Sequence, residues 1–150
     1  MSGRSILAAA LCLAMLGASL SVMAQKSEME GKKAPAFSGK TVGGKAYSLD
    51  SMLEKGPVFL YFIKKDCPVN ARAEKFYNEI YAATGGQANF LGVINGDAEQ
   101  YKRWQKRFNA PFPVVLDAED TIIHAYKAER SPWVIEVGKN GKVTKVWEGY

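Results

Sequence analysis

The stretch Val58–Ile80, VFLYFIKKDCPVNARAEKFYNEI, decides the fold. It begins with six apolar or aromatic residues, Val58–Ile63, bounded upstream by Gly56-Pro57. A short run of this kind is typical of a strand that is buried on both faces. Apolar side chains at helical spacing follow, and they predict a helix with these residues on its buried side: Ala73, Phe76, Tyr77 and Ile80.

Cys67 lies at the junction between this strand and this helix, and Pro68 follows it. Proline is favoured in the first turn of a helix, where its missing N–H costs nothing. A thiol at a helix N-terminus faces unpaired backbone N–H groups and the positive end of the helix dipole, which favours the thiolate. Lys64 and Lys65 add to this effect and Asp66 opposes it. We therefore predict a reactive thiol at Cys67; a buried, inert cysteine is the alternative.

Residues 1–24 are typical of a secretory signal peptide. Arg4 precedes an uncharged, largely apolar stretch that ends in Val22-Met23-Ala24. We predict cleavage after Ala24 and export to the periplasm or the extracellular space, without stable membrane insertion after cleavage. An uncleaved membrane anchor is the alternative. Cys12 leaves with the signal, so Cys67 is the single cysteine of the mature chain, which is unusual for an exported protein.

Chain length, net charge and histidine content limit which classes of function the sequence predicts. A chain of 150 residues predicts one domain with a substantial core. The net charge of +5 comes without a long basic block, so nucleic-acid binding is not predicted. His124 is the single histidine, with no second His or Cys nearby in the sequence, so we predict a surface position for it, no metal site and no cofactor.

The rest of the chain alternates between strands and helices. The polar residues 25–33 predict a flexible leader, and residues 34–150 predict the folded domain. Gly43-Gly44 predicts a hairpin turn. Further strands are expected at 89–94, 112–117, 133–137 and 143–147, and further helices at 97–108 and 121–128. This alternation predicts an α/β fold with a mixed sheet flanked by helices.

The helix at 97–108 has two specific signals. Asp97 is expected to cap its N-terminus. Three aromatic side chains at helical spacing are expected to lie in the core, with a stacking surface as the alternative: Tyr101, Trp104 and Phe108.

Several short motifs resemble, in their order and spacing, the thioredoxin-fold redoxins. These motifs are Gly31-x-x-Ala34-Pro35-x-Phe37, Asp66-Cys67-Pro68, Phe112–Asp117, Arg130–Ile135 and Gly141-Lys142-Val143. The group includes the alkyl hydroperoxide reductase/thiol-specific antioxidant (peroxiredoxin-like) proteins and the membrane-side thioredoxin-like reductases. The resemblance covers about Gly31 to Tyr150 and implies a thioredoxin-like fold with Cys67 at the active-site turn.

The chain departs from this family pattern at several positions. Asn70 stands where thioredoxin-type reductases have a second cysteine, and without that thiol a mixed disulfide cannot be released by internal attack. Leu60 and Lys64 stand where peroxiredoxins have a proline and a threonine. Relatives usually add a closing helix after the last strand. We expect that helix to be missing here, and one face of the sheet to be uncovered.

The resemblance also implies roles for three residues that precede the strand at 133–137. Arg130 is expected to hold Cys67 as the thiolate and to donate to peroxide oxygens, as in peroxiredoxins; a solvated arginine is the alternative. Pro132 is expected to be cis and, with Ser131, to present backbone groups to an extended peptide or thiol substrate. An ordinary trans proline is the alternative. Trp133 is expected in the core, with packing against the active site as the alternative.

The function implied by the resemblance is that of an exported one-cysteine redoxin. Cys67 would reduce a peroxide or a protein disulfide, and an external thiol reductant would restore it. Two alternatives remain open. In one, Cys67 forms lasting mixed disulfides with client proteins. In the other, the chain is a binding module that has kept the thioredoxin-like fold without efficient turnover.

Overall fold

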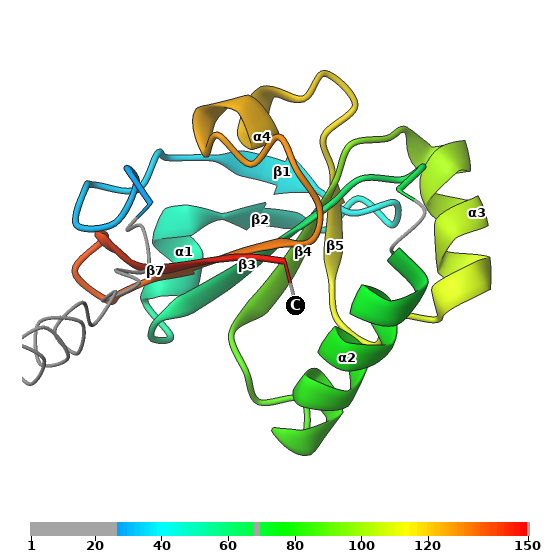
Figure 1. The fold of residues 1–150 in the computed structure, drawn as a ribbon, viewed down its shortest axis with the longest axis horizontal. Coiled ribbons are helices and arrows are strands. Elements are labelled where there is room, and N and C mark those ends of the chain that lie inside the picture. The colour runs from blue at the N-terminus through cyan, green and yellow to red at the C-terminus, as the bar shows by residue number, and fades with distance from the viewer. Residues whose placement is uncertain (1–26, 68–69, 150) are drawn as a thin grey trace, which may run out of the picture.

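A central mixed sheet organises the chain. The computed structural model describes residues 27–67 and 70–149, so the predicted signal peptide and Pro68 lie outside the described residues. The sheet has the order β5-β4-β3-β6-β7 (Figure 1). β3, β4 and β5 are parallel, whereas β6 is antiparallel to β3 and β7 is antiparallel to β6. The bounds are β3 Val58–Ile63, β4 Phe90–Ile94, β5 Val114–Leu116, β6 Trp133–Val137 and β7 Val143–Glu148.

The central strand β3 is buried on both faces, as its apolar sequence predicts. Leu60 and Phe62 point into the core on one face of the sheet, and Tyr61 and Ile63 point into the core on the other. All four side chains are almost fully inaccessible to solvent. The predicted α/β architecture with a mixed, helix-flanked sheet is confirmed.

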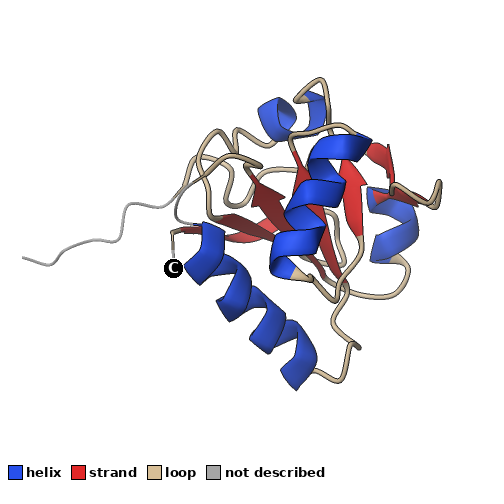
Figure 2. Cartoon of the chain, turned by 90° about the vertical axis from the view of Figure 1, so that its right-hand side faces the viewer, coloured by secondary structure: helices blue, strands red, loops and turns tan. Residues whose placement is uncertain are grey.

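Helices cover the two faces in different ways (Figures 1 and 2). Helices α2 (Asn70–Ala83) and α3 (Ala98–Phe108) pack on the face that carries Tyr61. The other face is covered by the elements α1 Leu49–Leu53, α4 Thr121–Ala125 and the hairpin of β1 Ser38–Lys40 with β2 Ala46–Ser48. None of the helices in the described part of the chain is long and apolar enough to cross a membrane.

Helix α3 follows its sequence signals closely. Asp97 is its N-cap, as predicted, and it accepts a hydrogen bond from the Gln100 backbone N–H at 2.8 Å. The Gln100 side chain accepts in return from the Asp97 backbone N–H, which completes a capping box. Trp104 is buried, and Tyr101 and Phe108 pack partly buried against the same core cluster, so the predicted core role is confirmed.

Helix α2 is rotated from the orientation that its apolar pattern predicts. Ala73 and Tyr77 are buried, but Phe76 is 47% exposed and Ile80 is 41% exposed. With Trp147 of β7, these two side chains line an open apolar hollow of about 500 Å³. The prediction was therefore wrong for Phe76 and Ile80, because among the described residues no element covers the sheet on that side of the helix.

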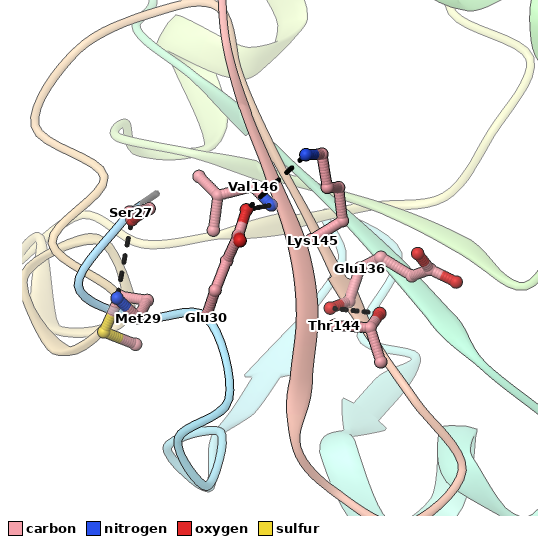
Figure 3. Close-up of polar contacts among 7 residues, drawn as sticks. All are labelled: Ser27, Met29, Glu30, Glu136, Thr144, Lys145 and Val146. Carbon is pink, nitrogen blue, oxygen red and sulfur yellow. Dashed lines mark hydrogen bonds and ion pairs between the residues drawn. The ribbon is translucent and has the colours of Figure 1, made fainter. Parts of the chain in front are cut away.

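The described part of the predicted leader, residues 27–33, lies along the β7 end of the sheet (Figure 3). The Gly31 N–H donates to the Val143 carbonyl at 2.8 Å, and the Glu30 carboxylate accepts from the Val146 N–H at 3.0 Å. Lys145 forms an ion pair with the same carboxylate at 3.9 Å, and Met29 is buried. An edge strand offers unpaired backbone groups, and this polar segment uses them.

Candidate active site

Cys67 lies where the central strand ends. After Ile63 the chain turns, and the Cys67 N–H donates to the Lys64 carbonyl at 3.0 Å. The Asn95 side chain, which directly follows β4, accepts a hydrogen bond from the Lys65 N–H at 2.9 Å. These two hydrogen bonds hold the turn that follows β3 and tie it to the end of the neighbouring parallel strand β4. Cys67 itself is half-buried and is a free thiol.

Strand pairing brings Ser131 and Pro132 to this turn. Phe62 of β3 is paired antiparallel with Trp133 of β6, so the residues before Trp133 lie beside the residues after Ile63. The Cys67 Sγ lies 3.9 Å from the Ser131 carbonyl oxygen, within hydrogen-bond distance for sulfur. The Ser131–Pro132 peptide bond is cis, as predicted. The structure thus brings both predicted substrate-binding residues to the turn that carries Cys67, with Ser131 in contact with the sulfur.

Arg130 directly precedes Ser131 in the sequence. Its exposed side chain lines a surface hollow together with Glu28, Lys127 and Trp133. Cys67 is not among the residues that line this hollow, and in the described part of the chain no hydrogen bond or ion pair joins the Cys67 and Arg130 side chains. Arg130 therefore directly precedes the residue that contacts the thiol, while its side chain lines a hollow that Cys67 does not line.

Helix α2 follows the turn that carries Cys67, residues 64–67, which we call the thiol turn. This helix holds a buried acid. Glu74 is 1% exposed, and its Oε1 accepts a hydrogen bond from the Tyr61 hydroxyl at 2.8 Å. Burial raises the pKa of Glu74 to about 7, against smaller opposing effects of the Tyr61 and Trp104 side chains. Burial also raises the pKa of Tyr61, and the negative charges of Glu74 and Cys67 raise it further. Tyr61 and Glu74 therefore form a buried, hydrogen-bonded pair on the α2 side of β3.

Sequence reasoning missed this acid–phenol pair. A glutamate within an exposed-looking stretch of a helix is normally read as a solvated residue. The available signal was Tyr61, because a hydroxyl in the middle of a fully buried strand needs a hydrogen-bonding partner. Glu74 directly follows Ala73, which was correctly predicted to face the core.

Two other predicted residues lie outside the site. His124 is exposed, as predicted, and Trp133 is buried in the core, also as predicted. In residues 27–67 and 70–149, no three His, Cys, Asp or Glu side chains gather as metal ligands would.

Comparison with known sequences places this site in a family context. A family model for the AhpC/TSA family matches residues 30–146. The thiol-disulfide oxidoreductase ResA of Geobacillus thermodenitrificans is 31% identical over 121 residues, which span 79% of this chain and 69% of the relative. The putative peroxiredoxin bcp of Coxiella burnetii is 21% identical over 132 residues, which span 78% of this chain and 86% of the relative.

Solved structures confirm the thioredoxin-like fold. The thioredoxin domain of a thiol-disulfide oxidoreductase from Bacteroides vulgatus has a TM-score of 0.68 at 21% identity, covering 79% of this chain and 88% of that one. A putative thiol:disulfide interchange protein DsbE from Chlorobium tepidum has a TM-score of 0.71 at 20% identity, covering 81% and 86%.

Proposed function

The chain belongs to the AhpC/TSA family, and from this membership we propose that it is a thiol oxidoreductase that exchanges disulfides with client proteins through Cys67. The observation that carries the proposal is the free, half-buried thiol at the end of β3, with its Sγ 3.9 Å from the Ser131 carbonyl. Relatives named thiol-disulfide oxidoreductase, at up to 31% identity, support the choice of a disulfide as the substrate.

The proposed chemistry uses Cys67 alone, because the predicted cleavage after Ala24 removes Cys12. The Cys67 thiolate attacks one sulfur of the client disulfide, forms a mixed disulfide and releases the other client sulfur as a thiolate. Asn70 leaves no second thiol at the expected position, so an external thiol attacks the mixed disulfide at Cys67 and frees the reduced client. A second external thiol then restores Cys67 and leaves as the disulfide of the reductant. Each cycle therefore consumes two external thiols.

Ser131 and Pro132 are proposed to position the client. They directly precede β6, and the Ser131 carbonyl oxygen lies beside the Cys67 sulfur. An extended peptide that lies along this segment brings its own sulfur toward Cys67, in the manner of a peptide that is added along a sheet edge.

Export is part of the proposal. Residues 1–24 have the pattern of a signal peptide, and an oxidising compartment supplies disulfide-bonded clients. The external reductant must then act in that compartment as well.

Peroxide reduction is a second candidate. It is favoured by the sequence position of Arg130, which directly precedes the residue that contacts Cys67, and by the relative named putative peroxiredoxin. Here the thiolate attacks a peroxide oxygen, the O–O bond breaks, and Cys67 becomes a sulfenic acid while hydroxide or an alkoxide leaves. External thiols reduce the sulfenic acid. This role requires the Arg130 side chain to turn toward the thiol.

One experiment separates these functions. Reduced protein is mixed with a neutral disulfide or with hydrogen peroxide, and mass spectrometry follows the modification of Cys67, with free N-acetylcysteine as the reference. A disulfide rate well above the reference supports the proposal. A peroxide rate above the reference that falls in Arg130→Gln, but not in the matched variant Lys139→Gln on a distant hairpin, supports the second candidate. If Cys67 reacts with the disulfide and with the peroxide no faster than N-acetylcysteine does, disulfide exchange and peroxide reduction are both refuted. The binding module then remains.

A further inference from the structure

A basic hollow lies directly beside the thiol turn. Residues from the turn and from α3 line a cavity of about 150 Å³: Lys65, Asp66, Gln100, Arg103, Trp104, Arg107 and Phe108. Lys65 and Asp66 immediately precede Cys67. The hollow therefore adjoins the turn that carries Cys67, on the α3 side of that turn.

The positive side chains reach this hollow for clear structural reasons. Arg103 and Arg107 lie on one face of α3 at helical spacing, and the Arg107 guanidinium stacks on the Phe108 ring at 5.0 Å from its centroid. The Lys65 stem passes Gly96 so closely that a side chain at Gly96 would contact it at 3.4 Å. Lys65 is thereby directed along the start of α3.

The positive charge in the hollow is only partly compensated. Asp66 is the one acid among the described residues that line it, against the three cations Lys65, Arg103 and Arg107. None of these three cations forms an ion pair with another described residue. By contrast Lys102, on the same helix but outside the hollow, is paired with Glu99 at 2.7 Å.

From this arrangement we infer that the hollow selects clients whose cysteine is flanked by acidic residues. The inference rests on the proposed disulfide exchange and names its substrate class. A glutamate or aspartate side chain next to the client sulfur would enter the hollow and meet the two arginines, which bind carboxylates well because of their planar, forked donors. The attraction accelerates the encounter with the thiol, and salt weakens it.

The test uses short peptides in which a central cysteine is activated as a mixed disulfide with thiopyridine. The peptides differ only in the flanking residues: glutamate, glutamine or lysine. Reaction with the reduced protein releases thiopyridone, whose absorbance gives the rate. We expect the glutamate peptide to react about fivefold faster than the glutamine peptide at low salt, and the lysine peptide to react more slowly than both. The advantage of glutamate should shrink at high salt.

Variants assign the effect to the hollow. In Arg103→Gln/Arg107→Gln the preference for the glutamate peptide should disappear, while the rate with the glutamine peptide stays unchanged, which also shows that the variant is folded and reactive. Lys106→Gln, on α3 outside the hollow, should keep the preference.

The outcomes distinguish this inference from the proposed function. Equal, fast rates with the glutamate and glutamine peptides overturn the inference and leave disulfide exchange intact. Rates no faster than N-acetylcysteine with every peptide overturn the proposed function itself. A preference that survives in the double arginine variant, or a faster reaction with oxidised glutathione than with the glutamate peptide, overturns the assignment of the hollow to acidic peptide segments.

Discussion

The buried carboxyl of Glu74 gives the folded protein a pH dependence that one substitution should remove. Burial raises the pKa of Glu74 from 4.5 to about 7, so the folded chain holds this proton more tightly than the unfolded chain does. Its contribution to stability is complete below pH 4.5 and is lost as the pH rises through 7. One pKa unit corresponds to about 1.4 kcal/mol, so the interval from 4.5 to about 7 corresponds to a loss of about 3 kcal/mol.

Glu74→Gln keeps the size of the side chain and cannot ionise. We expect the free energy of unfolding of the wild type minus that of the variant to fall by about 3 kcal/mol between about pH 4.5 and pH 8. Urea unfolding at closely spaced pH values, followed by tryptophan fluorescence, measures this difference. Glu79→Gln is the matched control, because Glu79 is an exposed glutamate on the same helix, with 67% of its side chain accessible. A flat difference for Glu74→Gln, or one that rises with pH, refutes the reasoning.

Five further substitutions, at four positions, test the packing and the thiol turn. Tyr77→Ala removes a buried ring and should lower the free energy of unfolding, measured by urea unfolding, by about 3 kcal/mol. Phe76→Ala removes a half-exposed ring and should lower it by less than about 1 kcal/mol. Equal losses for the two variants would contradict the observed rotation of α2. Asp117→Ala removes the buried carboxylate that accepts from two backbone N–H groups of α4 at 3.1 and 2.9 Å, and it should cost about 2 kcal/mol, with Asp117→Asn recovering part of the loss. Asn95→Ala frees the turn before the thiol and should slow disulfide exchange at a stability loss of about 1 kcal/mol; an unchanged exchange rate would show that this bond does not position the thiol.

The sheet could be predicted because its sequence signals are local. Val58–Ile63 and Phe90–Ile94 are apolar throughout, and only a strand covered on both faces needs such a run. The start of α3 could be predicted equally well, because the cap at Asp97 depends on residues within one helical turn. The position of Cys67 at the end of β3 follows from the same run.

The orientation of α2 could not be predicted in this way. An apolar pattern shows which side chains avoid water, but it does not show how much sheet lies opposite each of them. Phe76 and Ile80 have the helical spacing of core residues and nevertheless line an open hollow, while the charged Glu74 is buried against Tyr61. The orientation of α2 depends on a long-range contact, the one between Glu74 of α2 and Tyr61 of β3.

Arg130 illustrates a different limit. Its spacing from β6 predicts that its side chain reaches the thiol, but the observed contact with Cys67 is made by the next residue, Ser131. The direction of its side chain depends on the residues around it, and the structure directs it to a hollow that it shares with Glu28. A role of Arg130 at the thiol therefore stays a prediction, which the peroxide experiment tests.

In the proposed mechanism Cys67 acts without a second cysteine, and this changes where client selection must occur. A redoxin with two cysteines can release a wrong client quickly by internal attack, whereas a mixed disulfide on Cys67 lasts until an external thiol arrives. Selection before the covalent step is then more effective than selection after it, and charge acts at that earlier, encounter stage. The proposed division follows: β3 and β6 supply the reactive sulfur, and the arginines of α3 supply the choice of client. Substitutions at Arg103 and Arg107 should accordingly alter which disulfides react while leaving the reaction with a neutral disulfide unchanged.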